Sequence, residues 1–240
     1  MANSYYIAAC VFTDRFPELS GKIQKYIKER HGIEILRCCV PNHKVAEYEE
    51  KMPEGVFRDN WRALQHCADF MPGETVYSLC HNCSNIIEET RPGVNVRSLW
   101  ELILSDTDFK FSNHSGMKAV IQDCWRSKER SGEQQAVRQL LQKMGIDFIE
   151  ADQNKANTEF CGASLYRAQP ERNPRIAPIH YVEKAKGKFI PHTLEQQKEI
   201  MTEHCSHYQC ETVICYCHYC LEGLLMGGAN GIHIAKLLFE

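Results

Sequence analysis

The sequence predicts an α/β protein built from two similar halves, each with a mainly parallel sheet and with cysteines at the carboxyl ends of its strands. Two observations lead to this class. Short apolar segments of strand length alternate with amphipathic segments of helical length, which is typical of βαβ units around a parallel sheet. The same order of elements and cysteines then occurs a second time, which indicates an internal repeat. We therefore expect one repeat over residues 1–115 and another over residues 116–240.

The first half is expected to open with a buried strand that ends near Cys10. A helix over residues 17–32 follows, because Pro17 suits a first helical turn and Gly32 suits a helix end. Apolar side chains recur at helical spacing between them. The remaining elements are two strands and two helices, predicted over residues 33–38, 74–80 and 57–70 and directly after Cys83.

The second half repeats this order with one interruption. Its predicted strands cover residues 117–124, 146–151 and 211–217, and its predicted helices cover 132–145 and 194–208 and begin again at 219. Between the second and third strands, an insertion around residues 163–193 breaks the pattern. Prolines concentrate in Pro170–Pro178, so we expect a long ordered insertion or lid.

Composition limits the classes of function. The net charge of −3 and the lack of a long basic run disfavour a nucleic-acid partner. No apolar stretch approaches the roughly 20 residues of a membrane span, and the N-terminus lacks the features of a signal peptide. We therefore expect a cytoplasmic protein, in which 13 cysteines indicate metal or redox chemistry rather than disulfides.

The cysteines follow the repeat. In the first half they are Cys10, the adjacent pair Cys38 and Cys39, and the CxxC motif of Cys80 and Cys83. Four thiolates suit zinc and iron–sulfur clusters equally well. Five exceed the four ligands of a structural zinc site, but they suit a larger cluster in which one thiolate bridges two irons. The adjacent pair would then let one strand end supply two different irons.

This pattern resembles the CCG (cysteine-rich) domain family, which includes the CCG-domain subunit of heterodisulfide reductase. The family has a lone cysteine, then Cys-Cys-Gly, then CxxC, usually twice per chain, and the resemblance here extends from Cys10 to Cys220. The segments AACVFTDRFPEL and QDCWRSKER also resemble the openings of the two family repeats. The resemblance implies a non-cubane [4Fe-4S] cluster that cleaves a disulfide at iron, one electron at a time. Its implied ligands are Cys10, Cys38, Cys39, Cys80 and Cys83.

The chain departs from the family pattern in both halves. Val40 stands where the family has glycine, and Phe160 stands at the first position of the second Cys-Cys-Gly motif. The motif cysteines of the second half are Cys124, Cys161, Cys217 and Cys220. These four suit zinc or a second [4Fe-4S] cluster. Cys215 shares a strand face with Cys217 and is the candidate extra ligand, with a packed core thiol as the alternative.

Several other residues near the motifs are candidates for a role. His81 and His218 each follow the first cysteine of a CxxC motif. Either they donate hydrogen bonds or protons at the cluster, with His81 as the candidate proton donor, or they face solvent. Six cationic residues can offset thiolate charge or bind an anionic substrate, with a solvated position as the alternative: Arg37, His43, Lys44, Arg126, Lys128 and Arg130. Three cysteines lie outside the pattern and are expected as packed or surface thiols, with the first of them inside a helix: Cys67, Cys205 and Cys210.

These features together predict an iron–sulfur protein of anaerobic redox chemistry, which reduces a small disulfide or thiol substrate or passes electrons inside a complex. The ferredoxin run C-x₂-C-x₂-C-x₃-C-P is absent, so we expect electrons from a ferredoxin-like protein or a flavoprotein subunit. Two alternatives stay open. One is a zinc-stabilised binding or structural module without redox activity, and the other is a thiol–disulfide exchanger that uses Cys80 and Cys83 directly.

Overall fold

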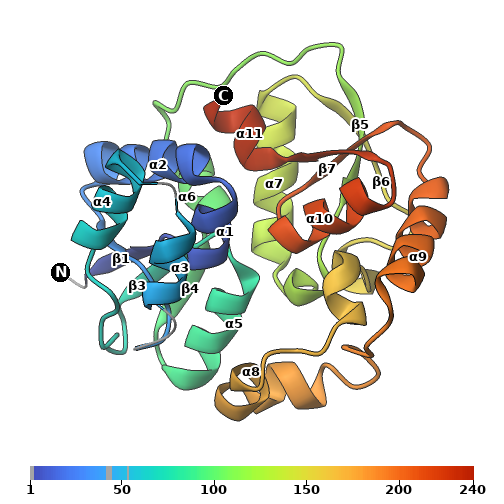
Figure 1. The fold of residues 1–240 in the computed structure, drawn as a ribbon. Helices are drawn as coiled ribbons and strands as arrows, with labels where there is room; N and C mark the ends of the chain where they lie inside the picture. Colours follow the sequence, from blue (N-terminus) through green and yellow to red (C-terminus); the bar gives the residue numbers. More distant parts are fainter. Residues whose placement is uncertain (1–2, 42–44, 53) are drawn as a thin grey trace. The chain divides into compact units, whose positions relative to one another are not determined.

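The computed structural model describes residues 3–41, 45–52 and 54–240 as an α/β chain with two four-stranded parallel sheets (Figure 1). The chain divides into two compact units, Met1–Leu99 with Phe239–Glu240, and Trp100–Leu238. Each unit contains one sheet. The predicted fold class is confirmed, while the repeat boundary between residues 115 and 116 stays a prediction about the duplication.

The sheet of the first unit has the order β2-β1-β3-β4, and all its neighbouring strands are parallel. Its strands are β1 (Ser4–Ile7), β2 (Glu34–Leu36), β3 (Thr75–Ser78) and β4 (Asn95–Ser98). Tyr6 on β1 pairs with Ile35 on β2 and Tyr77 on β3. The central strand β1 is flanked on both sides, so its residues Tyr6 and Ile7 are almost fully buried, as its apolar sequence predicts.

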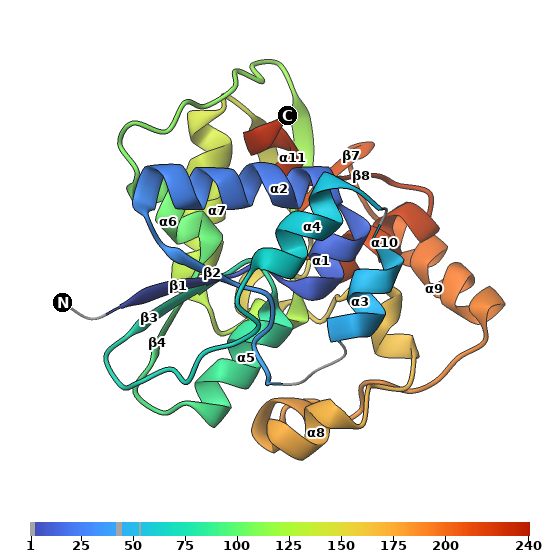
Figure 2. The same ribbon diagram turned by 60° about the vertical axis from the view of Figure 1, so that its left-hand side comes forward.

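The helices of the first unit follow the predicted order (Figure 2). They are α1 (Cys10–Arg15), α2 (Pro17–Tyr26), α3 (Val45–Lys51), α4 (Val56–Ala63) and α5 (His81–Thr90), while α6 (Leu99–Ser105) leads into the second unit. A π-helical turn, Ile27–His31, extends α2 to Gly32, whose φ of 64° ends the helix in the left-handed region. The helix predicted over residues 17–32 is therefore confirmed.

The helix predicted over residues 57–70 is wrong beyond Ala63. Leu64 turns into an extended conformation, and Gln65 forms an isolated parallel bridge with Leu36 at the end of β2. The segment 64–70 thus runs beside β2 as extended chain, and Cys67 lies in this segment rather than in a helix. The reason is tertiary: the carbonyls of residues 65 and 66 accept hydrogen bonds from the chain that continues β2.

The second unit repeats the same strand order, β6-β5-β7-β8, again fully parallel. Its strands are β5 (Lys118–Gln122), β6 (Asp147–Glu150), β7 (Thr212–Cys215) and β8 (Asn230–His233). Its further helices are α7 (Ser131–Lys143), α8 (Arg172–Ile176), α9 (Leu194–Ser206), α10 (His218–Met226) and α11 (Ile234–Phe239). In sequence order, strand for strand, this matches the first unit and supports the predicted duplication.

The predicted insertion, residues 163–193, contains α8, the π-helical turn Ile179–Glu183 and most of the 3₁₀ segment η4 (Gly162–Tyr166). After it, α9 begins with a capping box: Thr193 Oγ1 accepts from Gln196 N–H, and the Gln196 side chain accepts from Thr193 N–H. In the part of the chain that the structure describes, no helix combines the length and apolar character needed to cross a membrane.

Candidate metal centres

Cysteines follow the strand ends at the carboxyl edge of each sheet. Cys38 and Cys80 lie two residues after the ends of β2 and β3. In the second unit, Cys124 and Cys217 lie two residues after β5 and β7. Neighbouring strands are parallel, so within each unit these ends come together at one edge, where ligands of α/β sheets usually bind.

The first unit brings together all five motif cysteines of its half, which we call the five-cysteine group. Hydrogen bonds join their thiols in a chain that runs from Cys10 to Cys38, Cys39, Cys83 and Cys80. Four of them are at most 9% exposed, and Cys10 is the partly exposed member. A chain of contacts suits a cluster of several metal atoms, because its thiolates bind different atoms rather than one point.

The thiols of the five-cysteine group make each other harder to ionise. The hydrogen bond with Cys38 and burial hold the pKa of Cys10 well above its usual value. The bond with Cys38 likewise raises the pKa of Cys39, and bonds with Cys39 and Cys80 raise the pKa of Cys83. Metal ligation requires thiolates, so binding of a metal at this group releases protons and weakens as pH falls.

Local backbone contacts present these sulfurs at the edge of the sheet. Cys80 N–H donates to Ser78 Oγ at 3.0 Å, just before α5 begins, and Cys83 lies in the first turn of that helix. Cys38 N–H donates to the His66 carbonyl at 2.9 Å, which fixes the chain after β2 against the segment 64–70. The adjacent cysteines therefore lie in a short irregular stretch between β2 and α3.

Buried aromatic and imidazole side chains lie close to the CxxC motifs. Tyr6 is 1% exposed, and burial together with Cys83 and Cys80 raises its pKa; no motif in the sequence marks this neighbour beyond its place on a central strand. His81 and His218 open α5 and α10 and are 3% and 2% exposed. The solvent-facing alternative is therefore wrong for both histidines, and the role of His81 as proton donor stays a prediction.

The flanking cations have different fates. Arg37 forms a partly buried ion pair with Glu49, 3.8 Å between Nη1 and Oε2. Lys128 pairs with Glu159 at 3.0 Å, and Arg130 lies directly before α7. His43 and Lys44 lie outside the described residues. Arg126 differs from these residues because it contacts a motif sulfur of the second unit.

The second unit brings together Cys124, Cys161, Cys217 and Cys220, which we call the four-cysteine group. Their sulfurs all lie within 4.8 Å of one another, with 3.3 Å between Cys124 and Cys161 and 4.0 Å between Cys161 and Cys217. All four are at most 3% exposed. This group can hold a metal ion. Four thiolates at about 2.3 Å from one tetrahedral zinc stand about 3.8 Å apart, so the spacing favours a single ion over a cubane, which spreads its ligands over separate irons.

A close approach of two backbones builds the four-cysteine group. Gly162 has a φ of 57°, and a Cβ at this position would lie 2.0 Å from the Tyr219 carbonyl oxygen on α10. Only glycine allows this contact, which holds the residue after Cys161 directly against the helix that carries Cys220. The first half has Val40 at the matching place, outside the left-handed region, so its loop follows a different path.

Phe160 occupies the position that the family pattern gives to cysteine. Its carbonyl accepts from Trp125 N–H at 2.7 Å, which joins the chain after Cys124 to the chain before Cys161. Its ring stacks on His204, with centroids 4.1 Å apart and planes 5° from parallel. At 8% exposure, the ring packs one side of the four-cysteine group with apolar surface.

Arg126 is the main feature that the sequence left undecided. It is 7% exposed, its guanidinium donates to Cys161 Sγ, and Nη1 lies 3.2 Å from Ser164 Oγ. Three rings lie 5.2–5.6 Å from its guanidinium carbon, those of Trp125, Phe189 and Tyr219. Phe189 belongs to the predicted insertion and has a φ of 59°, an unusual conformation for an aromatic residue. The insertion thus covers Arg126, whose solvated alternative is wrong.

The arginine makes the thiols of the four-cysteine group unequal. Burial, followed by the bond with Cys161, holds the pKa of Cys124 well above its usual value, and burial does the same for Cys220. Burial also acts to raise the pKa of Cys161, but hydrogen bonds from Cys124 and Cys220 and the charge of Arg126 outweigh it, and that pKa is lowered. Cys161 is therefore the thiol of this group most readily ionised.

A buried carboxylate fixes the chain before Cys124. Asp123 is fully buried and accepts from Tyr216 Oη at 2.6 Å and from Arg138 Nη2 at 2.7 Å. Its N–H donates to Asn154 Oδ1 at 2.6 Å. These partners come from three different parts of the unit, so the strand end that carries Cys124 is held from several sides. No sequence motif marks this network.

The remaining cysteines are distributed as follows. Cys215 is fully buried, lies outside the four-cysteine group and is 3.7 Å from the Cys217 carbonyl oxygen. Cys67 and Cys205 are partly exposed, with burial raising the pKa of each. Cys210 is also partly exposed. All thirteen cysteines fall within the described residues and none forms a disulfide.

Comparisons with known proteins add little to this picture. No protein-family model and no curated protein matches the sequence. Among solved structures, the chain is similar to glutamate racemase isoform RacE1 from Bacillus anthracis, at 10% identity over 99% of this chain and 78% of that one, with a TM-score of 0.30. It is also similar to PH1733, an aspartate racemase homologue from Pyrococcus horikoshii OT3, at 11% identity over 100% and 96% of the chains, with a TM-score of 0.30. At this level of overlap, the activity must be argued from the residues of this chain.

Proposed function

We propose that this chain is a metal-dependent redox protein whose five-cysteine group holds an iron–sulfur cluster of the non-cubane [4Fe-4S] type. The observation that carries the proposal is the chain of thiol contacts from Cys10 through Cys38, Cys39 and Cys83 to Cys80. Five thiols exceed the needs of one tetrahedral ion. They match, residue by residue, the ligand set implied by the resemblance to the CCG domain family.

The proposed reaction is the reduction of a disulfide, RSSR′, by two electrons and two protons to RSH and R′SH. A bound cluster supplies the electrons one at a time, and a ferredoxin-like protein or a flavoprotein subunit replenishes them. The residues of the chain bind, position and protonate. Cys10, the partly exposed member of the group, marks its accessible side, and buried His81 at the start of α5 is the candidate donor of a proton to the leaving thiolate.

We assign a structural zinc ion to the four-cysteine group. The sulfur spacing supports a single ion, and four thiolates complete its coordination, so no position is open for a substrate. This same observation favours the second candidate function, a zinc-stabilised binding or structural module without redox activity. The two candidates differ in the content of the five-cysteine group, which is the point to test.

Anaerobic purification followed by iron, acid-labile sulfide and zinc analysis, with electron paramagnetic resonance, tests the proposal. We expect a brown protein that contains iron, sulfide and zinc. Cys83→Ser should lose iron and sulfide but keep zinc, and Cys220→Ser should lose zinc but keep the iron signal. Cys205→Ser, a partly exposed cysteine outside both groups, is the matched control. A colourless anaerobic protein that contains zinc alone would refute the redox proposal and leave the zinc module.

A further inference from the structure

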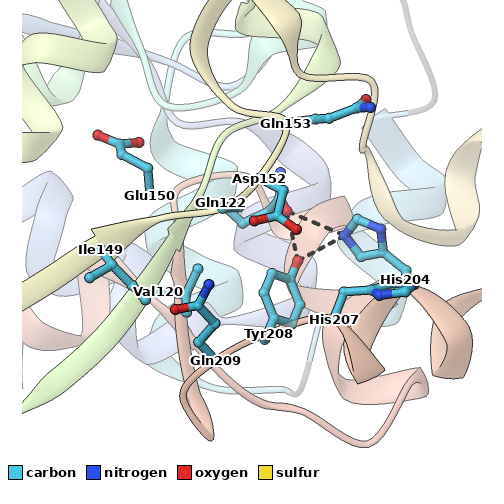
Figure 3. A pocket seen from close by; sticks show the side chains of 11 residues that line it. Val120, Gln122, Ile149, Glu150, Asp152, Gln153, His204, His207, Tyr208 and Gln209 are labelled. Carbon is cyan, nitrogen blue, oxygen red and sulfur yellow. Dashed lines mark hydrogen bonds between the residues drawn. The ribbon is translucent and has the colours of Figure 1, made fainter.

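A cavity of about 410 Å³ opens in the second unit, away from all four cysteines of the metal group. It lies between the ends of β5 and β6 and the end of α9 (Figure 3). We call it the β6–α9 pocket, and its main lining residues are Val120, Gln122, Ile149, Asp152, His204 and Tyr208. Its volume is in the range of sites that bind small molecules, and neither the sequence motifs nor the proposed function accounts for it.

One end of the pocket is polar and rigid. Gln122 is 1% exposed, and its Nε2 donates to the Asp123 carbonyl at 2.9 Å, which fixes the orientation of the amide. Its Oε1 then accepts from Tyr208 Oη at 2.7 Å and faces His204 Nε2 at 3.3 Å (Figure 3). His204 is held in turn by its stack on Phe160. These groups satisfy one another, so they form a preorganised wall rather than a mobile surface.

The opposite side is apolar. Val120 and Ile149 are paired in register on β5 and β6, and both line the pocket. Ile149 is 40% exposed, which is unusual for a large aliphatic side chain on a strand, although single exposed residues are common. Here it adjoins a second aliphatic residue at a cavity, so the pair offers a surface for a short hydrocarbon chain.

The charge of the pocket selects the sign of a ligand. Two carboxylates, Glu150 and Asp152, are among the lining residues, and none of these residues is lysine or arginine. Glu150 is already engaged by Arg138 and Lys155. Asp152 lies at an exposed position and supplies the negative charge of the pocket. Burial lowers the pKa of His204 to about 4, so the imidazole does not offset that charge at neutral pH.

We propose that the β6–α9 pocket binds a small aliphatic amine, with its ammonium group at Asp152 and its hydrocarbon chain on Val120 and Ile149. The site is independent of the proposed redox function, since none of these residues belongs to either cysteine group. The ammonium group is attracted by the carboxylate, and the aliphatic part removes the Val120–Ile149 surface from water. An anion of the same length would meet the carboxylate and be repelled.

Isothermal titration calorimetry of the full chain with n-butylammonium, n-butyrate and n-butanol tests this site. We expect saturable binding of n-butylammonium that weakens with added salt and with shortening to methylammonium, and no binding of n-butyrate. Asp152→Asn should weaken binding by about five- to tenfold, while Asp147→Asn, an exposed residue of the same strand outside the pocket, should leave it unchanged. Unchanged affinity in Asp152→Asn, equal binding of the alcohol or the acid, or no saturable binding of n-butylammonium would each overturn the proposal.

Discussion

Replacing Arg126 by methionine is expected to weaken metal binding at the four-cysteine group. A divalent ion with four thiolates carries a formal charge of −2, and the buried guanidinium on Cys161 Sγ reduces this local charge to −1. Methionine has a similar length and retains packing against the aromatic rings, but it has neither charge nor donor. A hydrogen bond to a charged group contributes about 1.5–3 kcal/mol, equivalent to about 10- to 150-fold in metal affinity. Residues that support metal ligands usually contribute in this range.

The affinity is measured by competition for zinc between the protein and a chromogenic chelator under anaerobic conditions. Arg126→Lys should be intermediate, because lysine keeps the charge but lacks the planar donor fork that suits a stacked site. Arg175→Met removes one positive charge from an exposed position of the same unit and should match the wild type. If Arg126→Met binds zinc as tightly as Arg175→Met, the contact with Cys161 does not stabilise the bound metal and this reasoning is wrong.

Three further perturbations probe separate parts of the chain. Cys39→Ser should alter or abolish the iron–sulfur spectrum of anaerobic protein while Cys67→Ser leaves it unchanged, and equal spectra would show that the adjacent pair does not act as ligands. Gly162→Ala should abolish zinc retention because its Cβ would lie 2.0 Å from a backbone oxygen, whereas Gly187→Ala, with a similar positive φ but nothing within 4 Å, should cost only the strain of about 1 kcal/mol in urea unfolding. His204 has a pKa of about 4 in the folded chain against 6.5 when unfolded, so it contributes stability that is complete above pH 6.5 and is lost as pH falls to 4, by at most about 3 kcal/mol. His204→Gln should remove that slope from the difference in unfolding free energy between variant and wild type, and parallel curves would contradict the assignment.

Local sequence signals were sufficient for the central strands and for the cysteines at their ends. Residues 4–7 and 212–215 are short apolar runs, and short runs of this kind form buried strands almost regardless of the remaining fold. The cysteine order then predicted which thiols would meet, because parallel strands bring their carboxyl ends to one edge. Both predicted sets of cysteines are indeed brought together, one within each unit.

Elements with weak local signals were missed or misplaced. The edge strands β4, with the sequence NVRS, and β8, with NGIH, have exposed and polar residues, and only pairing with β3 and β7 makes them strands. The segment 64–70 carries a helical pattern, yet hydrogen bonds to residues 37 and 38 hold it extended. In these places the partner strand supplies the stabilisation that the segment itself lacks.

The sequence by itself determined the α/β class, the repeated order of elements and the membership of both cysteine groups, because each depends on residue type and on spacing along the chain. Only the tertiary structure decided that Arg126 is a buried partner of Cys161 rather than a solvated cation. It alone also decided the spacing of four sulfurs around one point and the pocket beside His204. These features join residues that are far apart in sequence, such as Arg126 with Phe189 and Tyr219. A charge on a strand end looks the same in the sequence whether it meets water or sulfur, and packing of distant segments settles which one it meets.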